Sequence, residues 1–185
     1  MSGRIRSARG FTLVELMLVV GIIGLMSSVA LPSFNRSLLR TRTAERQMIM
    51  ESITRSLYDY GAQHGFGQPD STGVPDPTQD GTWTSPQNPP GDPSPTKRVW
   101  TQGMSGFKEL PLVVNGACYF SYYFSATKSG TTSDFWVVAN GDLDGDGVQT
   151  EKHIRYVSTG GAFQKDRASE YPQPGAEDDV TFHSF

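Results

Sequence analysis

The feature that most constrains this chain is an uncharged segment near its N-terminus. No charged residue lies between Glu15 and Arg36, and about 20 apolar residues are what one helix needs to cross the hydrocarbon core of a bilayer. The residues before this segment include Arg4, Arg6 and Arg9 and no acid. Because basic residues stay on the cytoplasmic side, the sequence predicts a single-pass membrane helix with a cytoplasmic N-terminus.

Glu15 stands at the edge of this segment and needs an explanation. A carboxylate in an apolar helix is costly, so it indicates a functional site with a partner for the charge. Residues 10–15 read Gly-Phe-Thr-Leu-Val-Glu, directly after the basic leader and directly before the apolar segment. Over roughly residues 4–55, this combination resembles the class III signal of type IV prepilins and of the pseudopilins of type II secretion.

The resemblance implies a processing step and an assembly role. Residues 1–10 correspond to a basic leader peptide that a prepilin peptidase/N-methyltransferase removes after Gly10, before it methylates the new N-terminal Phe11. In this family, the carboxylate at the position of Glu15 pairs with the N-terminal ammonium of a neighbouring subunit. An ion pair lowers the cost of a carboxylate in an apolar filament core, and it sets the register of subunits better than it adds net stability.

Two other interpretations of the N-terminus stay open. The Ser-Val-Ala sequence of residues 28–30 has the form of a secretory signal-peptide cleavage site, although Glu15 and the proline just after the cut argue against it. The segment also fits a plain membrane anchor, which needs neither a Gly-Phe pair nor a buried acid. The N-terminal residue of the purified protein distinguishes the three cases, because it is Phe11, Leu31 or Met1 respectively.

The helical pattern continues beyond the apolar segment. Apolar side chains keep recurring every three or four residues between arginines and glutamates, which predicts an amphipathic continuation. We expect one helix over residues 11–64, with residues 11–35 as its transmembrane or filament-core part. Pro32 predicts a kink and Gly24 weakens the helix locally. By resemblance, Gly24 and Pro32 lie where the helix of a type IV pilin partly unwinds on assembly.

The rest of the chain divides into a loop and a β-rich domain. Most of the 12 prolines fall within residues 65–97, which predicts a surface loop, since dense proline opposes both helices and central strands. Residues 98–185 contain short runs rich in β-branched and aromatic residues, which predict antiparallel strands before an irregular acidic tail. The predicted strands are residues 99–100, 112–114, 117–126, 135–139 and 153–158, with a hairpin turn at 127–133. We therefore expect an α+β fold, in which a long N-terminal helix packs on a small antiparallel β-sheet head domain, as in the pilin fold.

A group of aspartates forms the sharpest metal-binding pattern. Asp142, Asp144 and Asp146 occupy every second position, and a glycine follows the third. This spacing wraps oxygen ligands around calcium in short loops, and Glu151 is a fourth candidate ligand. The loop is not an EF-hand, because His153 stands at the twelfth position, where an EF-hand has glutamate.

The alternative to a calcium site is a hydrated Asp-Gly turn without metal. Three carboxylates this close in the sequence repel one another unless a cation lies between them, which favours a metal ion, and ligands that are all oxygens favour calcium over zinc or iron. The major pseudopilins resemble this chain in relying on calcium in such a loop. Cys118 is the only cysteine, so no intramolecular disulfide fixes the C-terminal half; its apolar neighbours predict a buried thiol.

Charge and motifs argue against several other functions. The chain has 16 basic and 19 acidic residues, without the basic stripe that is typical of nucleic-acid binding. None of the three histidines stands in a zinc motif or beside a nucleophile signature, so we expect no catalysis.

Together these features predict a type IV pilin-like filament subunit, major or minor. The expected partners are the prepilin peptidase, copies of the chain or other pilins, an inner-membrane assembly platform and, before assembly, membrane lipid. The precursor is expected in the bacterial inner membrane with its head outside the cytoplasm, and the mature chain in a pilus. The alternatives are a pseudopilin in a periplasmic type II secretion pseudopilus and, from another class, a single-pass membrane-anchored calcium-binding domain.

Overall fold

The computed structural model describes residues 11–171. They belong to two units, one ending at Leu38 and the other beginning at Leu39, and one long helix contributes to both. The predicted leader with Gly10 and the last part of the predicted acidic tail, residues 172–185, lie outside the described residues.

The first unit consists of the N-terminal part of helix α1. This helix spans Leu13–Gln63, close to the predicted limits, and it continues on both sides of Pro32. It is long and apolar enough to cross a membrane. Its large apolar side chains from Leu13 to Phe34 are all exposed. An exposed apolar surface of this length needs cover from lipid or from other protein molecules.

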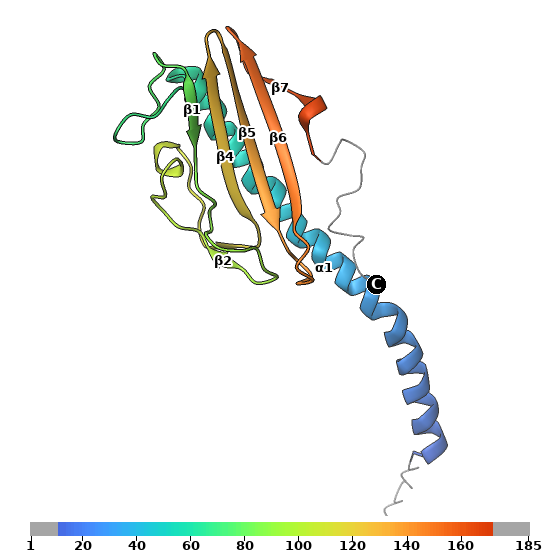
Figure 1. Ribbon diagram of the computed structural model, residues 1–185. Helices are drawn as coiled ribbons and strands as arrows, with labels where there is room; N and C mark the ends of the chain where they lie inside the picture. Colours follow the sequence, from blue (N-terminus) through green and yellow to red (C-terminus); the bar gives the residue numbers. More distant parts are fainter. Residues whose placement is uncertain (1–10, 172–185) are drawn as a thin grey trace, which may run out of the picture. The chain divides into compact units, whose positions relative to one another are not determined.

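The second unit contains a five-stranded antiparallel sheet in the order β1–β4–β5–β6–β7 (Figure 1). Its three long strands are β4 (Ser121–Ser129), β5 (Thr132–Gly141) and β6 (Thr150–Thr159). The short edge strands are β1 (Gly81–Thr84) and β7 (Gln164–Lys165). A separate pair is formed by β2 (Arg98–Val99) and β3 (Ala117–Cys118), and two short 3-10 helices span Phe107–Glu109 and Arg167–Ser169.

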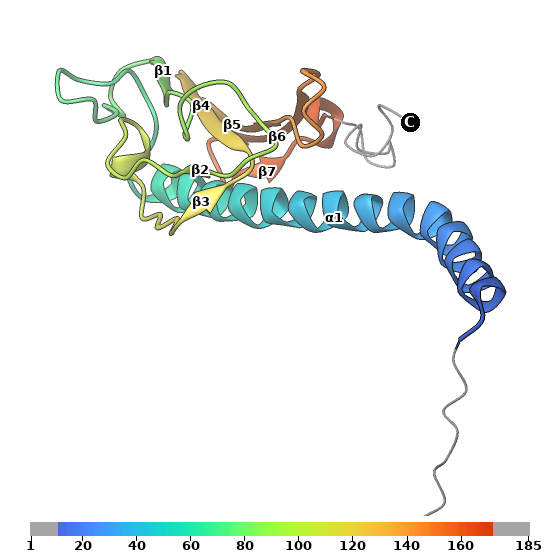
Figure 2. The same cartoon turned by 90° about the horizontal axis from the view of Figure 1, so that it is seen from below.

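The part of α1 in the second unit runs along one face of this sheet (Figure 2). Successive side chains of a strand point to opposite faces, and the alternate residues Tyr122, Phe124 and Ala126 of β4 are fully buried. The helix contributes apolar side chains to the same core at three- and four-residue spacing. These are Met50, Ile53, Leu57 and Tyr60. The predicted helix-on-sheet α+β architecture is confirmed.

The Pro-rich segment, residues 65–97, contains the strand β1, which the sequence did not predict. Trp83 of β1 is almost fully buried, and its ring centroid lies 5.1 Å from that of Tyr60 and 4.8 Å from that of Phe124. An edge strand pairs on one side only, so the surrounding prolines interrupt no central ladder. The burial of one tryptophan thus produces a strand in a segment whose composition predicts a loop.

Two further details of the sheet differ from the predicted elements or refine them. Residues 112–114 form no strand; they lie between Pro111, which has no N–H to donate, and Gly116, whose φ of 93° turns the chain. The predicted hairpin at residues 127–133 is present, but its turn is tighter. β4 continues to Ser129 and pairs with β5 from Thr132 onward.

Candidate functional site

The first candidate site is the start of α1, where Thr12 and Glu15 bind each other. The Glu15 Oε2 atom accepts hydrogen bonds from the Thr12 backbone N–H at 3.0 Å and from Thr12 Oγ1 at 2.8 Å. In return, the Glu15 N–H donates to Thr12 Oγ1 at 3.2 Å. This reciprocal pair is a capping box, in which two of the unpaired N–H groups at a helix start find partners.

The sequence reasoning missed Thr12, although the signal was present. Thr12 is followed three residues later by glutamate and then by an apolar run, which is the sequence signature of a capping box. The negative charge of Glu15 also suits the first turn, since a helix N-terminus carries partial positive charge. The carboxylate is therefore satisfied within one copy of the chain, and it is exposed, so a second partner can reach it.

The other predicted assembly residues are placed as follows. Phe11 is exposed and precedes the helix, while Gly10 lies outside the described residues. A Cβ atom added at Gly24 would meet no atom of the described residues within 4 Å. Pro32 lies inside α1. Glycine on an open helix surface permits close approach of a second helix.

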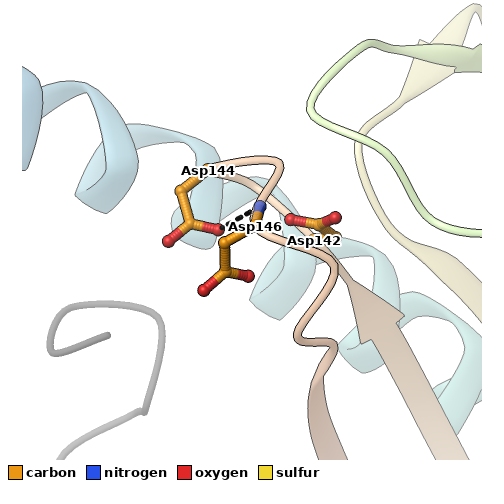
Figure 3. A group of neighbouring side chains, drawn as sticks. All are labelled: Asp142, Asp144 and Asp146. Atoms are coloured by element: carbon orange, nitrogen blue, oxygen red, sulfur yellow. Dashed lines mark hydrogen bonds between the residues drawn. The ribbon is translucent and has the colours of Figure 1, made fainter. Parts of the chain in front are cut away.

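The second candidate site is the loop between β5 and β6. It brings Asp142, Asp144 and Asp146 together, with one carboxylate oxygen of each lying within 4.8 Å of the others (Figure 3). Asp142 is buried, whereas the other two are exposed.

Backbone N–H groups hold these side chains in place. Asp142 accepts from Gly145 at 2.7 Å and from Gly147 at 3.3 Å, and Asp146 accepts from Val148 at 2.7 Å. Both glycines have positive φ, 79° and 83°, a conformation that costs little without a Cβ.

Glu151, the fourth predicted ligand, does not join the three aspartates. It lies in β6, where its Oε1 atom accepts from the Tyr123 hydroxyl at 3.2 Å and lies 2.8 Å from His153 Nε2. The three aspartates alone present a compact set of carboxylate oxygens, which is the donor type that calcium prefers.

Comparisons with known proteins find similarity at the N-terminal end of the chain. A family described as "Prokaryotic N-terminal methylation motif" matches residues 5–31. The type IV major pilin protein PilE of Neisseria gonorrhoeae is 34% identical over 64 residues, which cover 35% of this chain and 38% of that protein. The type IV major fimbrial protein FimA of Dichelobacter nodosus is 40% identical over 70 residues, which cover 36% of this chain and 43% of FimA.

A fimbrial protein of Neisseria meningitidis serogroup B is 35% identical over 57 residues, which cover 31% of this chain and 34% of that protein. The chain thus matches less than half the length of each of these relatives. No solved structure matches it.

The motif at residues 5–31, the capping box within it and the helix-on-sheet fold all agree: the chain is a pilin-like protein that carries the prokaryotic N-terminal methylation motif and is distantly homologous to the type IV major pilins.

Proposed function

We propose that this chain is a structural, non-catalytic subunit of a type IV pilin-like filament. A prepilin peptidase cuts the precursor after Gly10 and methylates Phe11, and the product assembles with copies of itself or with other pilins through an inner-membrane platform. The observation that carries the proposal is the methylation motif leading directly into a helix whose large apolar side chains from Leu13 to Phe34 are exposed. A membrane covers these side chains before assembly, and neighbouring helices cover them afterwards.

In this proposal, Glu15 exchanges one partner for another. Before assembly its carboxylate binds Thr12 of the same chain. On assembly it meets the N-terminal ammonium of a neighbouring Phe11, which carries a full positive charge. Removing the Glu15 carboxylate and the Phe11 ammonium from water costs free energy, which their mutual attraction offsets only when the two groups are in register. The exchange therefore selects correctly placed subunits.

The proposal is tested on the protein purified from cells that express its assembly system. We expect the N-terminal residue to be Phe11 with one added methyl group, and the chain to be recovered in sheared filaments. A Glu15→Ala variant should be processed normally and lost from filaments, whereas Val19→Ala, a control in the same apolar segment, should be incorporated. A chain that still begins with Met1, or that never enters a polymer, would contradict the proposal.

A pseudopilin of type II secretion is the second candidate. The observation that favours it is the loop that holds Asp142, Asp144 and Asp146, which we call the aspartate loop. Both kinds of subunit share the N-terminal processing, so the location of the filament separates them. Filaments on the cell surface support a pilus, and a polymer confined to the periplasm supports a pseudopilus. A monomeric membrane-anchored chain would support the single-pass calcium-binding alternative instead.

We also propose that the loop of Asp142, Asp144 and Asp146 binds calcium. The support is the grouping of three carboxylates on one loop with backbone donors that fix two of them. A divalent cation relieves the repulsion among these charges, and it would fix the loop between β5 and β6 in a chain whose single cysteine allows no intramolecular disulfide.

A further inference from the structure

One turn of α1 in the second unit makes several contacts with one short segment of the head. Arg42, Glu45 and Arg46 have i, i+3 and i+4 spacing, so they lie on the same side of the helix. The segment they meet is Tyr119 and Phe120, which join β3 to β4. We call Arg42 and Glu45 the helix clamp.

Glu45 contacts Tyr119 and also Lys97. Its Oε1 atom accepts a hydrogen bond from the Tyr119 backbone N–H at 2.8 Å. Its Oε2 atom lies 2.6 Å from Lys97 Nζ, in the chain just before β2. Hydrogen bonds to an ionised acceptor are the stronger kind, so one carboxylate ties both sides of the β2–β3 segment to α1.

Arg42 contacts Tyr119 and the aspartate loop. Its guanidinium carbon lies 4.8 Å from the Tyr119 ring centroid. Lys97 Nζ lies 4.9 Å from the same centroid. A cation near an aromatic ring is attracted by the ring's electrons. Arg42 also donates through Nη1 to the Leu143 carbonyl oxygen at 3.2 Å, which attaches the aspartate loop to the same turn of helix.

The clamp lies beside a buried part of the core. Arg46 is almost fully buried, with its guanidinium carbon 5.2 Å from the Phe120 ring centroid, and Cys118 next to Tyr119 is a buried free thiol. With a single cysteine, this region has no intramolecular cross-link. Polar contacts from α1 therefore supply the attachment that covalent bonds cannot.

We propose that Arg42 and Glu45 are positioning residues, which fix the β2–β3 segment and the aspartate loop to α1 and so determine how the head surface is presented to neighbouring subunits. The part about neighbouring subunits rests on the proposed filament function. The attachment itself does not depend on it.

Hydrogen–deuterium exchange of the full-length protein in detergent tests the attachment. A Glu45→Ala variant should raise the exchange rate at the Tyr119 amide about tenfold, as expected for losing a charge-assisted hydrogen bond, while amides in the centre of β5 keep their protection. Gln47→Ala, on the exposed side of the same turn, should leave Tyr119 unchanged. A double variant, Glu45→Lys with Lys97→Glu, should restore the ion pair but not protection of the Tyr119 amide.

Arg42→Gln should raise exchange in residues 142–149 and leave the Tyr119 amide protected by Glu45. Uniform loss of protection across the sheet in either variant would show a general stability effect and would overturn the positioning role.

Filament yield tests the second part. Glu45→Ala should be processed to Phe11 yet reduce incorporation into filaments severalfold relative to Gln47→Ala. Normal incorporation despite local opening at Tyr119 would overturn the effect on neighbouring subunits. If the unaltered chain itself forms no filament, the proposed function fails, and the exchange results still decide whether the clamp exists.

Discussion

At the start of α1, the contact with Thr12 gives the Glu15 carboxylate a hydrogen-bonding partner within its own chain. The position of Glu15 in an apolar segment indicated a partner, and the family resemblance placed that partner in another subunit. The structure adds a partner within the chain, Thr12. Apolar periodicity alone does not point to Thr12, because the capping-box pattern consists of the three-residue spacing between Thr12 and Glu15.

Replacing Thr12 should loosen the first turn of α1. In Thr12→Val, the hydroxyl that accepts from the Glu15 N–H is absent, so the Glu15 amide should exchange faster in NMR spectra of the full-length protein in detergent micelles. Thr12→Ser keeps the hydroxyl and should behave as the unaltered chain does. Equal exchange in all three proteins would show that the cap does not hold the first turn.

Cys118 should be unreactive in the folded protein. Burial raises the pKa of its thiol from the ordinary 9.0 to about 11, and the thiolate is the form that reacts. At pH 8, iodoacetamide should therefore leave Cys118 unmodified until a denaturant is added, as judged by the mass of the intact protein. Rapid labelling without denaturant would contradict the burial of this residue.

The raised pKa of Cys118 also predicts a pH dependence of stability. The folded state holds the proton more tightly than the unfolded state does, so this contribution is complete below pH 9 and is lost as the pH rises toward 11. A Cys118→Ala variant should show less loss of stability than the unaltered chain over this interval, measured by urea unfolding.

At the scale of elements, long regular patterns were predictable and short pieces were not. The repeat of apolar residues predicted α1 almost to its end, and runs rich in β-branched and aromatic residues predicted the central parts of β5 and β6. β1 escaped prediction because four residues among prolines carry little pattern, and only contacts from distant elements make Trp83 a core residue. The aspartate grouping was predictable from spacing alone, whereas the separation of Glu151 from the aspartates depends on its place in β6, where its side chain contacts Tyr123 and His153.

Trp83 should be a major source of stability for β1. Its side chain is 1% exposed, and removing a buried aromatic side chain costs about 3–5 kcal/mol. Trp83→Ala should lower the free energy of unfolding of the head by that amount in a urea titration, and Trp83→Phe should lower it less. Val99→Ala, on an exposed side chain, serves as the control and should change stability by less than about 0.5 kcal/mol.

Calcium should stabilise the loop between β5 and β6. We expect the melting temperature of the full-length protein in detergent to rise with millimolar calcium and to fall when EDTA removes it, since a ligand that binds only the folded state stabilises that state. Asp144→Asn should abolish the difference, while Asp59→Asn, on α1, should preserve it. Identical melting temperatures with calcium and with EDTA would rule the calcium site out.

For the whole molecule, the first unit should determine where the chain resides before assembly. A charged side chain in the middle of a membrane helix costs about 2.5–3.5 kcal/mol on insertion scales. Val20→Arg should therefore shift the precursor from the carbonate-resistant membrane fraction toward the soluble or degraded fraction, and Val20→Leu should not. Retention of both variants in the membrane would argue that another segment anchors the chain.

The uncovered apolar surface along the beginning of α1 has a further consequence for the life of each molecule. Such a surface is unstable in water, so in the proposed filament function a copy would pass from lipid to polymer directly, without a free aqueous stage. On the same proposal, a filament that disassembles would have to return its subunits to the bilayer or lose them to precipitation. Reversible assembly of the proposed filament would therefore take place at a membrane rather than by release of subunits into the surroundings.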